Sequence, residues 1–169
     1  MQTIALPNGT TIDFRDVTPD DKPLLHLIYS SSREEEMALV TQWDEEQKAA
    51  FIRQQFEAQY QYYAEMYAGA HFMIVQHETE AAGRLYLHFR EKEIRIVDIA
   101  LLRPFRNKGI GESILRAVLA QGTALHLPVT IHVERYNQAL RLYQRLGFKV
   151  ISEEHPIYFL MEWQPEEAP

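Results

Sequence analysis

The sequence predicts a mixed α/β (α+β) fold, in which a central, mostly antiparallel sheet of about six to seven strands is flanked by helices. Short β-rich runs alternate along the chain with amphipathic segments of helical period. Two of these runs, residues 70–76 and 83–89, are separated by a polar turn and are typical of a hairpin. A third run, residues 94–102, leads through a basic, glycine-containing turn into a helical segment. A chain of 169 residues, 46% of them hydrophobic, can bury a full core, so we expect residues 1–169 to form a single domain.

The first part of the chain predicts an extended segment and two helices. Two short extended pieces surround a Pro-Asn-Gly turn within residues 3–17. Thr18 then offers a capping hydroxyl, followed by a proline and two aspartates, so a helix is expected to begin there. The stretch 30–43 has no clear pattern. Asp44 opens a capping-box-like sequence, and large side chains at three- and four-residue steps predict a long helix over residues 44–67. Its apolar stripe, which is expected to belong to the core, consists of Ile52, Phe56, Tyr60, Tyr63 and Tyr67.

The second part predicts two further helices and three further strands. The amphipathic segment 112–121 predicts a helix, and the apolar run 129–133 predicts a strand. A short helix follows, and the last two strands are expected at residues 148–152 and 158–163. Residues 164–169 are acidic and contain two prolines, so we expect a frayed tail.

The composition excludes several classes of protein. The chain has no cysteine, so a disulfide framework, a thiolate metal site and a cysteine nucleophile are all excluded. The histidines lack metal-ligand spacing, so no metal is predicted. A net charge of −7 argues against nucleic acid as the main partner. No apolar run reaches the roughly 18 to 20 residues of a membrane span, and the amino terminus has no leader-like pattern, so we expect a cytoplasmic protein with no membrane partner.

The basic turn is the strongest candidate binding element. Arg103, Arg106 and Lys108 place three positive charges within six residues, beside Gly109 and Gly111. Glycines let backbone N–H groups approach a phosphate closely, and the following helix adds its positive end. A solvated turn is the alternative, but the clustering favours an anion site that suits a pyrophosphate.

Two other nucleotide-binding motifs fit this turn less well. A P-loop requires Gly-Lys-Ser/Thr, whereas Gly111 is followed by Glu112. A dinucleotide fingerprint requires a third glycine, and Ile114 stands there, although Glu134 lies at a suitable distance for a ribose contact. Too few residues follow the motif to build the rest of a doubly wound sheet, so a nucleotide-dependent oxidoreductase is disfavoured.

A second motif follows in the segment from Asn137 to Gly147. Asn137 can cap a helix, Ala139 and Tyr143 share its buried side, and Gly147 can end it. These structural roles account for the asparagine, the alanine and the glycine. Tyr143 could also be a core residue, but its hydroxyl group needs a partner, and a departing thiolate beside the basic turn would be one.

Together, the two motifs resemble the acetyl-CoA-binding core of the Gcn5-related N-acetyltransferase (GNAT) superfamily. The resemblance extends over the whole chain, since residues 14–21 are similar to the family's first strand and helix start, and residues 158–163 to its last strand. It implies an acetyltransferase that moves an acetyl group directly from acetyl-CoA, as co-substrate, to a primary amine, without an acyl-enzyme. A non-catalytic CoA-binding sensor or interaction module on the same fold is the alternative.

The resemblance also implies roles for individual residues. Backbone groups near Leu101 and Leu102 would pair with the pantetheine arm, as an added strand does. The N–H groups of residues 106–111 would hold the pyrophosphate, Asn137 would contact the cofactor arm, and Tyr143 would protonate the departing CoA thiolate. The implied cofactor-binding residues are Leu101, Leu102, Arg103, Arg106, Asn107, Lys108, Gly109, Ile110, Gly111, Asn137 and Tyr143.

Three residues are candidates for the general base that takes a proton from the amine. Asp98 shares a strand face with Leu102, and its apolar sequence neighbours suggest that burial raises its pKa. His132 and Glu134 share a face of the next strand, which the family fold separates from the strand of Asp98 near the site.

Each candidate base also has a purely structural alternative. His132 could be a satisfied core histidine, and Glu134 an ordinary acid near the start of the next helix. Asp98 could be an ion-pair partner of Arg84 or Arg95.

The resemblance leaves the acceptor amine open between a small molecule, a lysine side chain and a protein N-terminus. Asp98, Glu134 and His155 would favour a cationic amine. The loop over residues 30–43 and the turn over residues 153–156 are expected to shape its pocket.

Some aromatic residues lie off the stripe of the long helix. Trp43, Phe51 and Tyr62 could line the acceptor pocket or a contact between two copies of the chain. Exposed strand edges and these aromatics are compatible with a homodimer.

Overall fold

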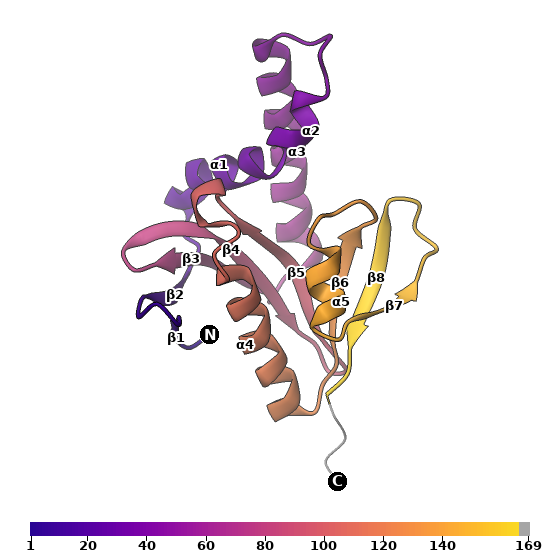
Figure 1. Ribbon diagram of the computed structural model, residues 1–169. Coiled ribbons are helices and arrows are strands. Elements are labelled where there is room, and N and C mark those ends of the chain that lie inside the picture. Colours follow the sequence, from indigo (N-terminus) through magenta and orange to yellow (C-terminus); the bar gives the residue numbers. More distant parts are fainter. Residues whose placement is uncertain (166–169) are drawn as a thin grey trace.

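The computed structural model describes residues 1–165 and contains an eight-stranded sheet in the order β1-β2-β3-β4-β5-β6-β8-β7 (Figure 1). Every neighbouring pair of strands is antiparallel except β5 and β6, so the predicted mixed, mostly antiparallel sheet is confirmed. The strands are β1 (Ile4–Ala5), β2 (Thr11–Asp16), β3 (His71–His77), β4 (Glu80–Phe89), β5 (Ile94–Leu101), β6 (Val129–Glu134), β7 (Lys149–Ser152) and β8 (Tyr158–Trp163). The sheet has one strand more than expected because β1, only two residues long, pairs with β2 and extends its edge.

The helices also follow the predicted order. They are η1 (Pro19–Asp21), α1 (Lys22–Ser32), α2 (Glu34–Ala38), α3 (Glu45–Met66), η2 (Arg103–Phe105), α4 (Ile110–Leu125) and α5 (Leu140–Arg145). The predicted capping box is present at α3, where the Asp44 side chain accepts from the Gln47 N–H and the Gln47 side chain accepts from the Asp44 N–H. Part of the expected frayed tail, residues 166–169, lies outside the described residues.

Helices cover both faces of the sheet and create two cores. On one face, α4 buries Ile114 and Val118 against Ile96 and Ile131 of the central strands. On the other face, α1 and α3 build a second core from the residues Leu25, Tyr29, Ile52, Phe56, Ile74 and Tyr86. The apolar stripe of α3 is therefore core, as predicted, while the first half of α3, with α2 beside it, rises beyond the sheet (Figure 1).

The sheet opens between its two central strands. Strands β5 and β6 are paired only where Ile94–Ile96 lies beside Val129–Ile131. Directly after this, a register irregularity between β4 and β5 leaves Val97 without a partner and sets Asp98 opposite Tyr86. The splay that the resemblance implies is thus present, and Asp98 is the first residue of β5 beyond the bulge.

No helix in residues 1–165 is both long enough and apolar enough to cross a membrane.

Candidate active site

The loop between β5 and α4 presents a run of unused backbone N–H groups. Asn107 and Gly109 adopt left-handed backbone conformations, with φ of 57° and 78°. None of the N–H groups of residues 107–112 donates to a backbone carbonyl of the described chain, and the first bond of the helix joins the Ser113 N–H to the Gly109 carbonyl (3.0 Å). Alternating left- and right-handed residues at a helix start make an anion-binding concavity.

The two glycines of this loop are required for different reasons. Gly109 has open space around its Cα but needs its left-handed conformation. At Gly111, an added Cβ would meet only Cδ1 of Leu101 at 3.7 Å, which is an ordinary contact. Since the folded chain has room for a side chain at Gly111, the glycine is explained by a ligand that approaches the backbone. The loop therefore fits a pyrophosphate.

The three basic side chains of the loop differ in availability. Arg103 is exposed and lies 3.6 Å from Glu34. Arg106 uses its donors within the protein. Its Nε donates to the Leu101 carbonyl (2.7 Å), and its Nη2 donates to the carbonyl and Oγ of Ser31 (3.0 and 3.1 Å). Lys108 is exposed and makes no ion pair within residues 1–165. Lys108 is thus the most accessible charge, while Arg106 joins the cofactor loop to α1.

An acidic residue in the first turn of α4 is neutralised by two arginines. Glu112 accepts from Nη2 of Arg116 and from Nη2 of Arg145, each at 2.8 Å. These two hydrogen bonds lower the pKa of Glu112. The pair of arginines compensates a charge that would otherwise repel a phosphate at this helix end.

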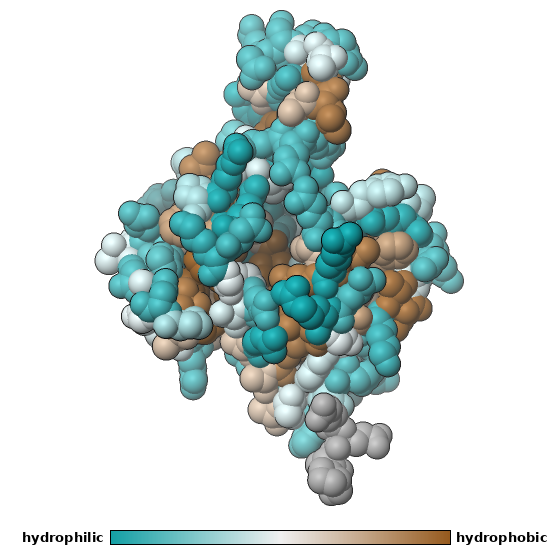
Figure 2. Space-filling view, in the orientation of Figure 1, coloured by the Kyte–Doolittle hydropathy of each residue, from teal (hydrophilic) through white to brown (hydrophobic). Residues whose placement is uncertain are grey.

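Leu101 and Leu102 end β5 at the opening of the splay. Leu102 uses both of its backbone groups within the protein, because its N–H donates to the Ala82 carbonyl (2.8 Å) and its carbonyl accepts from the Phe105 N–H (2.9 Å). The Leu101 carbonyl accepts from Arg106. A pantetheine arm could therefore pair with Leu102 only through the second lone pair of its carbonyl, because its N–H is already used. In this region, Figure 2 shows a hollow with hydrophobic surface at its floor and hydrophilic side chains around it.

Asn137 forms a turn rather than the first residue of a helix. Its side chain accepts from the Ala139 N–H (2.8 Å), and its carbonyl accepts from the Leu140 N–H (3.1 Å). Helix α5 begins at Leu140 with Ala139 as its N-cap, so the predicted cap at Asn137 is two residues too early. The side chain caps the turn that leads into α5.

Tyr143, on α5, is buried in the core on the α4 face of the sheet. Its side chain packs edge-on against Phe148, with ring centroids 5.7 Å apart, and the residue is 5% exposed. Its hydroxyl group makes no hydrogen bond to any residue that the structure describes. Burial raises the pKa of Tyr143, and the charge of Asp98 raises it further. The phenol therefore keeps its proton at neutral pH and lies within electrostatic reach of Asp98.

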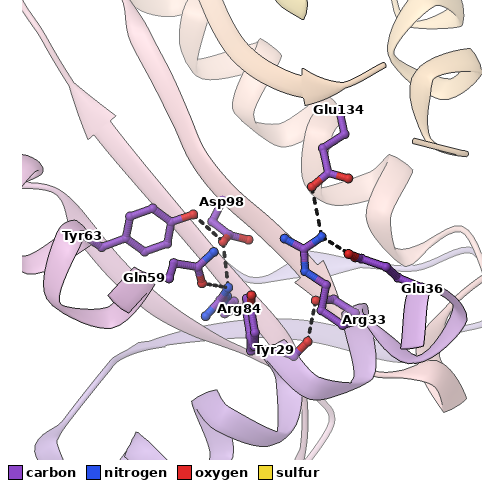
Figure 3. Close-up of polar contacts among 9 residues, drawn as sticks. Tyr29, Arg33, Glu36, Gln59, Tyr63, Arg84, Asp98 and Glu134 are labelled. Carbon is purple, nitrogen blue, oxygen red and sulfur yellow. Dashed lines mark hydrogen bonds and ion pairs between the residues drawn. The ribbon is translucent and has the colours of Figure 1, made fainter. Parts of the chain in front are cut away.

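Asp98 is held by a network of side chains from α3 and β4 (Figure 3). Its Oδ2 accepts from Nη2 of Arg84 (2.8 Å) and from the hydroxyl of Tyr63 (2.9 Å), while Gln59 accepts from the same Nη2 (2.8 Å). Oδ1 has no hydrogen bond to a described residue. The surroundings of Asp98 are thus polar, contrary to the expectation from its sequence neighbours.

The two structural alternatives for Asp98 can now be separated. Arg84, which is 3% exposed, is its ion-pair partner. Arg95 instead pairs with Glu93 and donates to Thr130. One oxygen of Asp98 is fixed by these contacts and the other remains free to accept a proton.

His132 lies outside both cores, so it is not a core histidine. Its Nδ1 is 3.1 Å from Nη1 of Arg95. An arginine can only donate, so Nδ1 must accept, and the neutral ring then carries its proton on Nε2. Partial burial and the charge of Arg95 both lower the pKa of His132. The ring has no free lone pair while this contact is kept, which weakens its case as a general base.

Glu134 faces a pocket on the side of α1 and α3. Its Oε1 accepts from Nη1 of Arg33 (3.2 Å), and the same nitrogen donates to Oε2 of Glu36 (2.8 Å), as Figure 3 shows. The pocket has a volume of about 280 Å³ and is lined by Tyr29, Arg33, Glu36, Phe51, Ile52, Gln55, Glu134, Ile157 and Tyr158.

The origin of these lining residues agrees in part with the sequence analysis. The stretch 30–43 contributes Arg33 and Glu36, and the residues directly after the turn 153–156 contribute Ile157 and Tyr158. Phe51 lines the pocket and packs against Trp43, with centroids 5.2 Å apart. The exposed Tyr62 does not belong to the lining.

Several residues of the site were not found from the sequence. Tyr63 was assigned to the apolar stripe, and Gln59 and Arg33 carried no motif. The only local signal was the spacing of Arg33 and Glu36, which suits an ion pair on a helix. Within residues 1–165, no group of three or more His, Asp or Glu side chains is arranged to hold a metal ion.

Comparisons with known proteins agree with this arrangement. The chain is similar to the PaiA N-acetyltransferase from Thermoplasma acidophilum, solved in complex with coenzyme A (19% identity, TM-score 0.66, 90% of this chain and 98% of that chain). It is also similar to an acetyltransferase from Thermus thermophilus (17% identity, TM-score 0.65, 95% of this chain and 99% of that chain). A third similar structure is Arabidopsis thaliana Naa50 in complex with the bisubstrate analogue CoA-Ac-MVNAL (16% identity, TM-score 0.61, 90% of this chain and 98% of that chain).

At these identities the solved structures establish the fold. A search of curated proteins gives no match. The profile of the Acetyltransferase (GNAT) family matches residues 35–148, which include the basic loop, Asn137 and Tyr143. Because this match covers well over half of the chain, the protein belongs to the GNAT acetyltransferase family.

Proposed function

We propose that this protein transfers an acetyl group from acetyl-CoA directly to a primary amine of a small molecule or peptide. The observations that carry the proposal are the unused backbone N–H groups of residues 107–112, which fit a pyrophosphate, and the charge of Asp98, which acts on the buried Tyr143. Among the described residues, the hydroxyl of Tyr143 and Oδ1 of Asp98 have no hydrogen-bond partner. The protein therefore offers a proton donor, a proton acceptor and a cofactor loop.

The cofactor is expected to bind along the face that carries α4. The N–H groups of residues 107–111 would hold the pyrophosphate, with Lys108 as an added charge. Asn137 and the backbone near Leu101 would contact the cofactor arm between the loop and Tyr143. The solved relatives support this, since one is titled as a complex with coenzyme A and another as a complex with a CoA-containing bisubstrate analogue.

In the proposed reaction a protonated amine first releases one proton to solvent. The nitrogen of the neutral amine then forms a bond to the thioester carbonyl carbon, and the carbon–sulfur bond breaks. Asp98 accepts the proton that the amine loses, through Oδ1, directly or through a water molecule. Tyr143 donates its proton to the sulfur as it leaves. Return of the proton from Asp98 to Tyr143, directly or through solvent, restores both groups.

Asp98 is preferred over the other two candidate bases because of its neighbours. His132 has its lone pair engaged by Arg95. Asp98 and Glu134 each accept from an arginine through one oxygen and keep the other oxygen free of described partners, but Asp98 is the candidate whose charge acts on Tyr143. Glu134 fits better as a group that attracts the amine, because it lines the pocket.

The first experiment is a calorimetric titration of the protein with acetyl-CoA, with NAD as the control, followed by a thiol-release assay with a panel of primary amines. Binding of acetyl-CoA alone, together with amine-dependent release of CoA, supports the proposal. Binding without release from any amine would identify a non-catalytic CoA-binding module. Absence of acetyl-CoA binding would reject the cofactor site and the proposed reaction together.

A further inference from the structure

We propose that the pocket beside Glu134 selects a primary amine that carries one positive charge on an apolar or aromatic body, and that Arg33 sets this selectivity. The inference rests on the proposed function and defines its acceptor class. It concerns the pocket where α1, α2, α3, β6 and β8 meet, which the contacts of Arg103 with Glu34 and of Arg106 with Ser31 join to the cofactor loop.

The charges that line the pocket add up to a single negative charge. Glu36 and Glu134 contribute two carboxylates, and Arg33 contributes one guanidinium. The Arg33 Nη1 is shared by one oxygen of each carboxylate. Oε1 of Glu36 and Oε2 of Glu134 have no hydrogen-bond partner among the described residues. One further cation would therefore neutralise the pocket and would find two free oxygens.

Arg33 already occupies one cation position in the pocket. Its guanidinium lies over the ring of Tyr29, 5.5 Å from the centroid, and between the two carboxylates (Figure 3). Burial alone would lower the pKa of Arg33, but Tyr29, Glu134 and Glu36 outweigh it, and the side chain stays charged. The second ammonium group of a diamine would meet this fixed positive charge, and like charges in close contact are strongly unfavourable.

The remaining walls suit an uncharged body. They are formed by the side chains of Phe51, Ile52, Ile157 and Tyr158, with Gln55 as the one amide. Burial and the nearby Glu134 raise the pKa of Tyr158, so its hydroxyl stays neutral. The volume of about 280 Å³ lies at the lower end of small-molecule sites and can hold a ring or a short chain. The free carboxylate of an amino acid would face two like charges here, so amino acids are expected to be poor acceptors.

The test compares matched amines in the thiol-release assay. Butylamine and 1,4-diaminobutane differ by one ammonium group, and 2-phenylethylamine and phenylalanine differ by one carboxylate. In the native protein, kcat/KM is expected to be at least about tenfold higher for the monoamine of the first pair and for 2-phenylethylamine in the second. Equal kcat/KM values for 1,4-diaminobutane and butylamine, or for phenylalanine and 2-phenylethylamine, would overturn the proposal while leaving the acetyl transfer itself intact.

The variant Arg33→Met isolates the role of the guanidinium. It leaves two carboxylates without their cation, so the preference for butylamine over 1,4-diaminobutane should fall by about tenfold or reverse. Arg53→Met is the matched control, because Arg53 is exposed on α3 outside the pocket. In this variant the ratio of kcat/KM for butylamine to kcat/KM for 1,4-diaminobutane should equal that of the native protein. An unchanged ratio in Arg33→Met would assign the residue a merely structural role.

Two further measurements keep the proposal testable if turnover is absent or a variant is unstable. Calorimetric titration of the acetyl-CoA-loaded protein with the four amines should give the same order of affinities without any chemistry. Glu36→Gln changes the pocket charge in the opposite direction and should weaken binding of both monoamines, with no gain for the diamine. If no amine releases CoA but the affinities follow the predicted order, the proposed function fails and the charge selectivity stands; equal affinities would reject the selectivity.

Discussion

The cofactor side and the acceptor side of the site meet where β5 and β6 separate, and they are built from different groups. On the cofactor side, consecutive backbone N–H groups of residues 107–112 face the ligand, and most nearby side chains serve the protein itself. On the acceptor side, side chains from several separate elements form the walls, and ion pairs around Arg33 fix their charges. The two sides should therefore respond to different mutations, and most mutations should affect only one of them.

The largest effect is expected from Gly111→Asp on the cofactor side. The carboxylate would occupy the space that the glycine leaves open at the start of α4 and would repel a phosphate, so acetyl-CoA affinity should fall by at least about 100-fold. The acid stands near a helix N-terminus, so the melting temperature should not fall. Calorimetry measures the acetyl-CoA affinity, and thermal melting measures the melting temperature. Unchanged affinity would mean that the cofactor lies elsewhere.

Gly111→Ala provides the steric control for this variant. Its Cβ fits the protein without a clash, so any loss of acetyl-CoA affinity with normal stability must come from contact with the ligand.

The next largest effect is expected from Tyr143→Phe, which tests the group at the junction of the two sides. Turnover should fall by about 10²-fold or more, since the sulfur loses its proton donor. Acetyl-CoA affinity should stay the same. The hydroxyl has no hydrogen-bond partner within residues 1–165, so stability should change by less than about 0.5 kcal/mol. A rate within about twofold of the native enzyme would remove Tyr143 from the chemistry.

The cofactor side could be predicted from the sequence because its parts are contiguous. Strand, basic loop and helix follow one another, and glycine positions report directly on backbone geometry. The prediction did not foresee that Arg106 binds Ser31, because that contact joins residues 75 positions apart. It also took Asn137 as the cap of the helix, whereas this asparagine closes the turn before it and Ala139 is the N-cap.

Asp98→Asn tests the acceptor-side base. Turnover should fall by about 10²-fold, because an amide cannot take the proton of the amine. The variant also removes the charge that balances the buried Arg84, so some loss of stability is expected, and turnover is compared at a temperature at which thermal melting shows the variant to be folded. Glu134→Gln is the control: a larger loss of turnover in this variant than in Asp98→Asn would make Glu134 the base.

The acceptor side could not be predicted in the same way. Arg33, Glu134 and Tyr158 come together only because α1 crosses the opening of the sheet and β8 pairs with β6. Tyr63 was correctly assigned to the core stripe, but the end of a core tyrosine can still reach a polar group, and here its hydroxyl reaches Asp98. Sequence spacing gives faces of single elements, whereas this pocket depends on how five elements are placed.

A smaller effect is expected from Arg106→Met, which removes the contact between the two sides. The side chain holds α1 to the end of β5, so kcat/KM for butylamine should fall by about tenfold while acetyl-CoA affinity changes by less than about threefold. Ser31→Ala removes only one of the three hydrogen bonds that Arg106 donates, so kcat/KM for butylamine should fall less than in Arg106→Met. The opposite result, a loss of acetyl-CoA affinity with normal use of the amine, would make Arg106 a phosphate ligand.

The smallest effect on the reaction is expected from Asp21→Asn, which loosens the start of α1 on the acceptor side. The carboxylate accepts two hydrogen bonds from Arg15 (2.8 and 2.7 Å) and further bonds from Thr18. The hydrogen bonds from Arg15 lower the pKa of Asp21 well below its usual value, burial opposes them, and Thr18 adds to the lowering. The folded state thus favours the ionised carboxyl, and its contribution to stability is present above the unfolded pKa of about 4 and is lost as the pH falls further.

The native protein should accordingly exceed Asp21→Asn in stability by about 1 to 2 kcal/mol between about pH 5 and 8, and by progressively less below about pH 4. Thermal melting across this range measures the difference. A gap that persists at low pH would show that the loss comes from packing rather than from the charge. Acetyl-CoA affinity should be unaffected, since the side chain of Asp21 accepts hydrogen bonds from Arg15 and Thr18, outside the cofactor loop. If the affinity falls as well, the two sides of the site are coupled through α1, and the contact of Arg106 with Ser31 would carry the coupling.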